Sequence, residues 1–196
     1  MHAMLKKVAG AVPAAALLVA LAPASAQAVT TAAPDPTVGA GVTCHGGAAR
    51  ISIKPGLTFG DKAQTWTGAG TTSGCNSSDS KLSVSSANAS FTGTGKGSCL
   101  PALGIPNAEM TGAIRWTMAG VDLDNQVSKV RGTAKLALSG ATFEGVVTDG
   151  PFKGNKVNAT ANWDFETNIV QAVAGCFTGG YTDATGTWDT LTVDVA

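Results

Sequence analysis

The chain has 196 residues, of which 44% are hydrophobic, and it carries equal numbers of acidic and basic residues, 13 of each. This length fits one domain beside a short terminal segment, and the apolar content is enough for a folded core, which excludes an intrinsically disordered chain. No cluster of Lys or Arg occurs in the long part of the chain after residue 28. Nucleic acid is therefore not expected as a partner, because phosphate binding needs a concentrated basic face.

Residues 1–28 predict a secretory signal peptide. Two lysines precede an apolar run of Ala, Val and Leu over 8–22, and small residues follow where a signal peptidase cuts. We expect cleavage after Ala26 or Ala28, with an uncleaved N-terminal anchor as the alternative. The apolar run is short for crossing a bilayer core, so the mature protein is predicted to be secreted, extracellular and without a membrane span. Loss of the two lysines leaves a net charge of −2.

Residues 29–41 are rich in Thr, Ala and Pro and predict a flexible leader. The remaining 42–196 predict a single all-β domain, because apolar and polar residues alternate with a period of two between closely spaced glycines. Val157–Phe165 is the clearest example. Such one-sided strands suit antiparallel sheets, so the expected fold is an antiparallel β-sandwich or closed β-barrel of about nine to ten strands. The expected strands lie near 49–54, 63–73, 81–86, 89–95, 111–119, 127–138, 141–148, 155–166, 168–174 and 186–195, with a long irregular connection over 100–110.

Four cysteines in an exported chain predict two disulfides. Three pairings are possible. We favour Cys44–Cys75 and Cys99–Cys176, because the first would tie the opening strand to the end of the next hairpin. A zinc site is the alternative, but the chain has no C-x-x-C pair and His45 is the one histidine after the signal peptide. No metal and no cofactor are therefore expected.

The run Ile53–Thr58, with the Gly/Thr strand that leads to Gly74 and Cys75, resembles small exported proteins of high-GC Gram-positive bacteria. The segment 145–154 adds to the likeness, which spans 42–196. This resemblance implies a secreted, two-disulfide, all-β protein and implies nothing about chemistry. The chromoproteins related to neocarzinostatin share these general features, but this chain is longer and lacks their compact cysteine spacing, so membership is not inferred.

Asp164 and Glu166 are the candidate catalytic residues. On one strand, acids two residues apart face the same side about 7 Å from each other, which lies within the separation of roughly 5–10 Å used in glycoside hydrolysis. This gives the alternative function, a small secreted carbohydrate-active hydrolase. Exposed strands commonly carry such acids, so a solvated surface is the simpler interpretation.

Three further patterns carry less weight. His45-Gly46-Gly47 is similar to an oxyanion loop, but the chain has no G-x-S-x-G nucleophile turn. Asp122–Asn125 offers oxygen ligands without the Gly and Glu that complete a calcium loop, and a turn explains these residues equally well. The Gly-rich stretch 91–97 lacks the spacing of a phosphate loop. An enzyme is therefore less expected than a binding module.

Trp66 and Trp188 are the candidate binding residues. Trp116 and Trp163 are in phase with apolar neighbours and predict core positions, whereas Trp188 is out of phase with the apolar residues after it and Trp66 has polar alternate neighbours. Exposed tryptophans stack on sugars or anchor protein partners. Packing inside a barrel is the alternative. The expected function is non-enzymatic binding of an extracellular ligand or surface.

Overall fold

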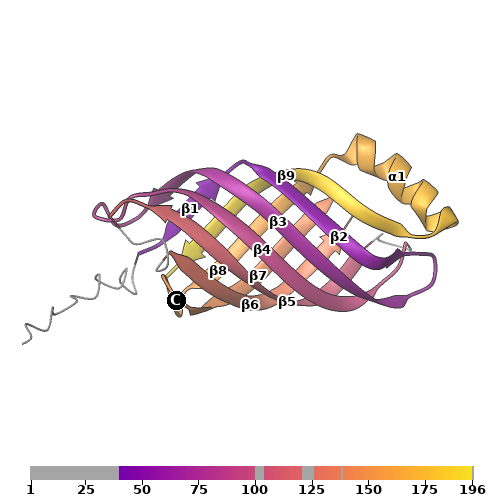
Figure 1. Ribbon diagram of the computed structural model, residues 1–196, viewed down its shortest axis with the longest axis horizontal. Coiled ribbons are helices and arrows are strands. Elements are labelled where there is room, and N and C mark those ends of the chain that lie inside the picture. Colours follow the sequence, from indigo (N-terminus) through magenta and orange to yellow (C-terminus); the bar gives the residue numbers. More distant parts are fainter. Residues whose placement is uncertain (1–39, 100–103, 121–125, 138, 196) are drawn as a thin grey trace, which may run out of the picture. The chain divides into compact units, whose positions relative to one another are not determined.

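The computed structural model describes residues 40–99, 104–120, 126–137 and 139–195 (Figure 1). The predicted signal peptide and nearly all of the predicted leader lie outside these ranges. Ala40, expected in the leader, is already part of the fold, because it is buried and its carbonyl accepts a hydrogen bond of 3.1 Å from the Asn155 side chain. Ala40 is therefore packed against the β domain.

Within the described residues, nine strands form one antiparallel sheet that closes on itself. From β2 to β9 each strand pairs with the next one along the chain, and β9 pairs with β2 to complete the barrel. This confirms the all-β, two-disulfide prediction and selects the barrel over the sandwich. The strands are β1 (Val42–His45), β2 (Ala48–Leu57), β3 (Lys62–Ser77), β4 (Val84–Gly97), β5 (Gly104–Met118), β6 (Val127–Ala137), β7 (Gly140–Asp149), β8 (Lys156–Trp163) and β9 (Tyr181–Asp194), and the helix α1 (Phe165–Thr178) connects the last two.

The first position of the barrel is occupied by two strands in succession. Both β1 and β2 lie between β3 and β9 and run antiparallel to them. They are separated by Gly46 and Gly47, which have φ angles of 69° and 116°. A Cβ on Gly47 would lie 1.8 Å from the Thr71 carbonyl oxygen, so this interruption requires glycine. The barrel thus has eight strand positions, the first of them broken at the two glycines.

Four expectations about individual elements are wrong. The expected strands over 81–86 and 89–95 are not separate, because β4 runs without interruption from Val84 to Gly97, and β5 begins at Gly104, inside the expected irregular connection. The expected strand over 168–174, and the end of the one over 155–166, belong to α1. Short apolar runs fit a strand or a helix equally well. Here the chain must travel from the end of β8 to the start of β9, and a helix spans that crossing.

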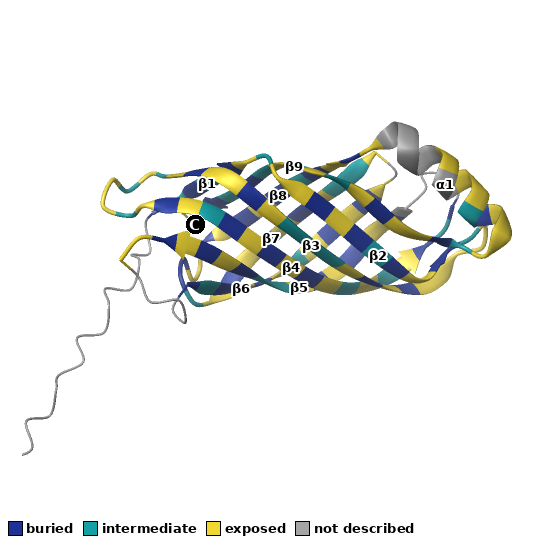
Figure 2. Ribbon diagram, turned by 45° about the horizontal axis from the view of Figure 1, so that its top comes forward, coloured by how far each residue is buried: buried dark blue, intermediate teal, exposed yellow. Residues whose placement is uncertain are grey.

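Side chains alternate between the barrel interior and solvent along every strand, which gives the chequered pattern of Figure 2. Apolar side chains fill the interior, whereas Thr, Ser, Asn and Lys dominate the outer face. An eight-stranded barrel is just wide enough to be filled by side chains or to hold one small ligand. The packing of the interior therefore decides which of these applies.

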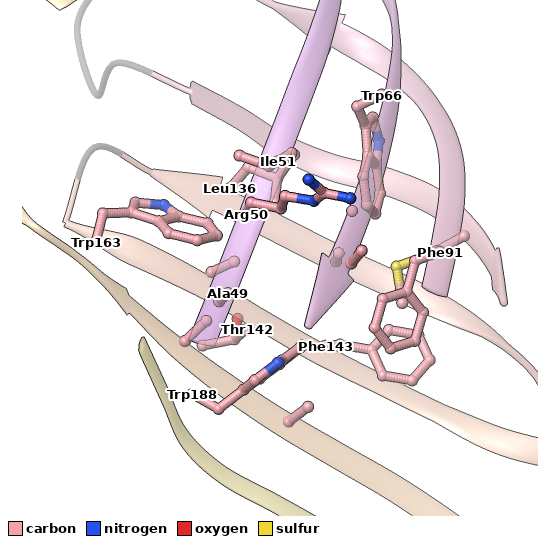
Figure 3. Close-up of a pocket in the computed structure, with 17 residues that line it drawn as sticks. Ala49, Arg50, Ile51, Trp66, Phe91, Leu136, Thr142, Phe143, Trp163 and Trp188 are labelled. Atoms are coloured by element: carbon pink, nitrogen blue, oxygen red, sulfur yellow. The ribbon is translucent and has the colours of Figure 1, made fainter. Parts of the chain in front are cut away.

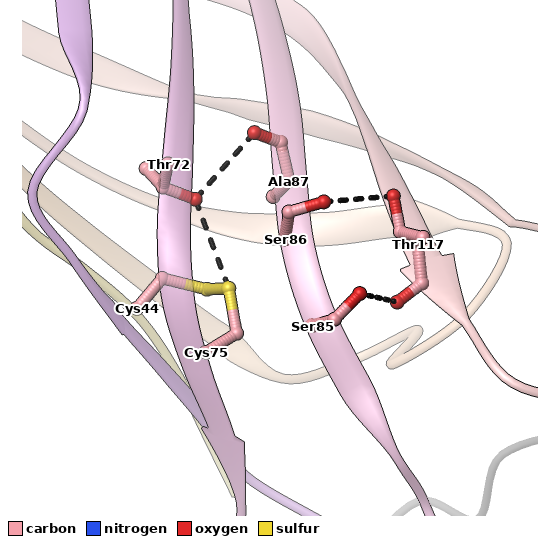
Figure 4. The surroundings of a disulfide bond; sticks show 7 residues. All are labelled: Cys44, Thr72, Cys75, Ser85, Ser86, Ala87 and Thr117. Atoms are coloured by element: carbon pink, nitrogen blue, oxygen red, sulfur yellow. Dashed lines mark hydrogen bonds between the residues drawn. A yellow bond between two sulfur atoms is a disulfide. The ribbon is translucent and has the colours of Figure 1, made fainter.

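Both favoured disulfides are confirmed. Cys44–Cys75 joins β1 to β3, beside the buried hydroxyl of Thr72, which donates a hydrogen bond of 3.5 Å to the Ala87 carbonyl (Figure 4). Cys99–Cys176 joins the segment after β4 to α1. The first bridge holds the interrupted opening strand in the wall, and the second holds the helix at one end of the barrel, here called the α1 end.

The opposite end of the barrel is filled by a plug of side chains. Phe152, in the turn between β7 and β8, is 1% exposed, and its ring packs edge-on against Trp116 with 5.2 Å between centroids. The Trp116 indole N–H donates to the Ser128 hydroxyl at 2.8 Å, and that hydroxyl donates to the Pro151 carbonyl at 2.5 Å. The tryptophan at this end is therefore both packed and hydrogen-bonded, and among the described residues here only the buried Asn155 Oδ1 has no partner.

Candidate functional site

A cavity of about 40 Å³ lies inside the barrel (Figure 3). All eight strand positions contribute to its wall, and apart from the exposed Arg50 and Thr142 its lining residues are apolar. Figure 3 shows aromatic rings entering from several strands around it. The aromatic lining residues are Trp66, Phe91, Phe143, Trp163 and Trp188.

The large rings lie against glycines of neighbouring strands. A Cβ on Gly93 would sit 2.5 Å from the ring of Trp66, and a Cβ on Gly112 would sit 2.4 Å from the ring of Phe91. Because these positions lack a Cβ, each ring can lie close to the wall instead of projecting into the middle. Phe143 is placed in the same way, over Gly132 and Gly145.

Small side chains complete the cavity on the remaining strands. Ala134, Ala159 and Ala161 are all buried and line it from β6 and β8. A close-packed interior has few voids larger than a water molecule. The cavity is more than the roughly 10–15 Å³ that one water needs, yet its apolar walls offer water few partners. It is therefore an apolar space in an otherwise tightly packed barrel.

Trp66 is not the exposed residue that its polar neighbours indicated. It is 3% exposed and points into the barrel. Its neighbour Gln64 is also buried, because its side-chain amide accepts from the N–H of Gly56 and donates to the carbonyl of Gly56, both at 3.1 Å. The next inward position is Gly68. In the sequence, Gln64 and Gly68 therefore indicated a solvent-exposed face for Trp66, although both lie on the inner face of β3.

Trp188 also points inward, although it remains partly exposed. In the ladder between β8 and β9, Thr160 pairs with Thr190 whereas Ala161 pairs with Trp188, so Asp189 is an extra residue. Such a bulge shifts the alternation by one position. This is why Trp188 is out of phase with the apolar residues after it in sequence and yet lies on the same side of the sheet. The two candidate binding residues therefore meet at one cavity, Trp66 as a buried wall and Trp188 as a partly exposed one.

The indole N–H groups of these two tryptophans find no acceptor among the described residues, although both nitrogens are buried. By contrast, the N–H of Trp163 donates to the Ala137 carbonyl at 2.9 Å, as that of Trp116 does to Ser128. An unpaired buried donor costs about 1–3 kcal/mol. Trp66 and Trp188 are thus held at the cavity by packing without a polar anchor, and the Trp188 side chain has no hydrogen bond to a described residue that would break if the ring moved.

The acidic pair does not have the geometry that suggested catalysis. β8 ends at Trp163, Asp164 is the exposed N-cap of α1, and Glu166 lies within the helix, its side chain outside the described part of the structure. The separation expected along one strand therefore does not apply. No described carboxylate or imidazole lines the cavity. Its walls suit binding of an apolar molecule and offer no acid or base for a reaction.

Among the other candidate residues, Phe91 of the stretch 91–97 lines the cavity, whereas His45 does not. His45 is exposed at the end of β1, and the Gly-rich stretch 91–97 is part of β4. Asp122–Asn125 lies outside the described residues. Across the part of the chain that the structure describes, no three His, Cys, Asp or Glu side chains gather closely enough to hold a metal ion.

Two sites show altered ionisation. On the outer face, Lys129 and Asp149 form an ion pair at 2.8 Å, and this hydrogen bond and its charges raise the pKa of the lysine and lower the pKa of the carboxyl. Tyr181, at the start of β9, is buried against the barrel. Burial, with a smaller contribution from the charge of Asp183, raises the pKa of Tyr181 to about 12. Neither group faces the cavity.

The two disulfides are consistent with an oxidising, extracellular setting. Among the described residues, no helix combines the length and apolar character needed to cross a bilayer. Comparisons with protein-family models, with curated proteins and with solved structures find no match to this chain.

Proposed function

We propose that the protein is a secreted, non-enzymatic binding module that takes up a small, uncharged, apolar molecule inside its barrel. The observation that carries this proposal is the apolar cavity enclosed by five aromatic side chains at the centre of the barrel. Concave, mostly apolar sites are the usual places for small-molecule ligands. A charged ligand is disfavoured, because none of the buried lining residues carries a charge to pair with it.

The size of the cavity limits the ligand in the present conformation. An engineered cavity of about 150 Å³ holds benzene, whereas this one measures about 40 Å³. A larger guest therefore requires a side chain to move. Trp188 is the best candidate, because it is partly exposed, its ring N–H has no described partner, and it lies directly before the bulge residue Asp189 in β9.

Secretion is part of the proposal. The lysine-flanked apolar run and the small residues at 26 and 28 support export through a cleaved signal peptide. Disulfides at both ends of the barrel support a working place outside the reducing cytoplasm. Mass spectrometry of the exported protein tests this directly, with an expected N-terminus at Gln27 or Val29.

Binding is tested with two uncharged probes, benzene and the larger N-phenyl-1-naphthylamine, titrated into the oxidised mature protein. We expect saturable binding to one site, detected as a rise in melting temperature and quenching of tryptophan fluorescence. Ala159→Leu fills the cavity and should abolish binding while the protein stays folded. Ala113→Leu, which adds the same atoms on the outer face of β5, is the matched control.

Trp188→Ala provides the second arm of the test. Removing the ring enlarges the cavity, so the larger probe should bind more tightly than it does to the wild type. The proposal is wrong if neither probe binds saturably, or if Ala159→Leu binds both probes as well as the Ala113→Leu control does.

A further inference from the structure

We propose that the α1 end of the barrel docks on an anionic lipid surface. Four of the six large hydrophobic side chains that are exposed in the described residues gather there. Val170, Val173 and Phe177 on α1 are 69%, 49% and 74% exposed, and Phe59 in the turn between β2 and β3 is 43% exposed. Figure 2 shows the described part of α1 largely open to solvent. Exposed apolar clusters of this kind mark interaction surfaces.

These side chains form one surface and are not scattered. Positions 170, 173 and 177 are spaced by three and four residues, which places them on the same side of a helix. The ring of Phe177 meets the ring of Phe59 edge-on, with 4.7 Å between centroids. The apolar face of α1 thus continues onto the β2–β3 turn.

The surface is held rigidly in place. Cys176, directly before Phe177, is buried and bonded to Cys99. From Thr167 to Thr178 the helix has no charged residue. A solvent-facing helix usually carries charges on its outer side, so the composition of α1 fits an apolar environment better than water.

The charges beside the two phenylalanines favour an anionic partner. Lys54, Lys62 and Lys96 are exposed on the adjacent strands β2, β3 and β4 near this turn, and none of them forms an ion pair with a described residue. The register places Lys62 opposite Gly97 and Lys96 opposite Ala63, so these two lysines are close neighbours. Anionic headgroups attract such lysines, while apolar side chains enter the boundary between headgroups and acyl chains.

Lys62 and Lys96 lie closer to the β2–β3 turn than two of the three carboxylates on the neighbouring strands and turn. Asp61 is in the turn itself, whereas Asp183 on β9 lies opposite Ser52 and Glu109 on β5 lies opposite Thr94, each further along the barrel. Asp164 lies at the other end of α1, a helix length of about 20 Å from Phe177. A second copy of the chain is a poorer partner, because a symmetric contact through Phe177 would bring the same lysines together.

The test is sedimentation of the oxidised mature protein with vesicles of phosphatidylcholine alone or mixed equally with phosphatidylglycerol. We expect binding to the mixed vesicles at low salt that weakens as salt is added. The variant with Phe59→Ser and Phe177→Ser should bind at least about tenfold more weakly, since each buried phenylalanine contributes strongly to transfer from water. Both residues are exposed, so folding should not suffer.

Two matched lysine variants distinguish binding through this surface from non-specific binding to anionic vesicles. Replacing Lys54, Lys62 and Lys96 together by Gln should reduce binding by roughly fivefold per lysine. The same change at Lys81, Lys153 and Lys156, which are exposed at the other end of the barrel, should leave binding nearly intact.

The proposal is overturned if mixed vesicles do not bind the protein at low salt, or if the two lysine triples weaken binding equally. It is also overturned if the protein forms a dimer that Phe177→Ser disrupts and shows no vesicle binding, which would assign the surface to a second copy. These outcomes are independent of whether the cavity binds a ligand.

Discussion

Two buried tryptophans that differ in their hydrogen bonding allow a direct test of the cavity wall. Trp66 and Trp116 are 3% and 1% exposed. The indole N–H of Trp116 donates to Ser128 at 2.8 Å, whereas that of Trp66 has no acceptor among the described residues. Replacing each tryptophan by phenylalanine removes the same ring atoms from the interior. The loss of packing is therefore similar, and the difference between the two variants reports the hydrogen bond.

The magnitude follows from this comparison. Trp116→Phe loses a hydrogen bond worth about 1 kcal/mol, while Trp66→Phe removes an unpaired buried donor that costs about 1–3 kcal/mol in the folded wild type. We therefore expect Trp116→Phe to lower the free energy of unfolding by about 2–4 kcal/mol more than Trp66→Phe does. For a domain of this size that corresponds to a melting temperature lower by at least about 4 °C.

The assay is urea unfolding followed by far-ultraviolet circular dichroism, because both substitutions alter the fluorescence. Trp163→Phe, which loses a bond of 2.9 Å to the Ala137 carbonyl, should behave like Trp116→Phe. Equal losses in the Trp66 and Trp116 variants, or a larger loss in the Trp66 variant, would refute the reasoning. Such a result would mean that the Trp66 N–H has a partner after all.

Three further predictions concern the barrel itself. Removing the bridge Cys99–Cys176, which joins residues 77 positions apart, should lower the free energy of unfolding by about 4.5 kcal/mol. Removing Cys44–Cys75, with a separation of 31, should lower it by about 3.7 kcal/mol, because the loop that it closes is shorter. Urea unfolding of the two double alanine variants measures both values. Tyr181 is the only tyrosine in the chain, so the absorbance of its phenolate should show a midpoint near pH 12 in the folded protein. Because the pKa is raised on folding, its contribution to stability is complete below pH 10 and should disappear between pH 10 and 12. A midpoint near pH 10 in the native protein would contradict the burial of this side chain. Gly93→Ala places a Cβ 2.5 Å from an indole ring and should lower stability by about 1–3 kcal/mol, while Gly60→Ala, with nothing within 4 Å, should have little effect.

Several features of the fold could be read from local patterns alone. The alternation in β2, β6 and β8 was sufficient to identify strands with one buried face, since side chains of a strand point to opposite sides by turns. The four cysteines led to the pairing Cys44–Cys75 and Cys99–Cys176, which the structure confirms. Trp116 and Trp163 were correctly placed in the core, because they share the phase of their apolar neighbours.

The candidate site was less accessible to such reasoning. Trp66 and Trp188 were identified as candidate binding residues, but on the outer face. The polar neighbour Gln64 and the bulge at Asp189 make the alternation of apolar and polar residues point to the wrong side of the sheet for these two tryptophans. The face on which a side chain lies depends here on contacts with other strands: Gln64 is buried through its bonds to Gly56, and the bulge exists only in the ladder with β8. The helix α1 was mistaken for a strand for a similar reason, since its apolar run fits either structure and the crossing from β8 to β9 decides between them.

The sequence by itself determined the repeating strands and the apolar interior, because alternation is a property of residues close together in the chain. It also predicted the disulfides, because an even number of cysteines in an exported chain indicates oxidation. Only the tertiary structure decided that the sheet closes through the pairing of β9 with β2, and that rings from one strand lie over glycines of the next. Closure and ring placement depend on residues far apart in sequence, whose distances local periodicity does not encode. The cavity arises from those long-range contacts, and so it became visible only once the barrel was assembled.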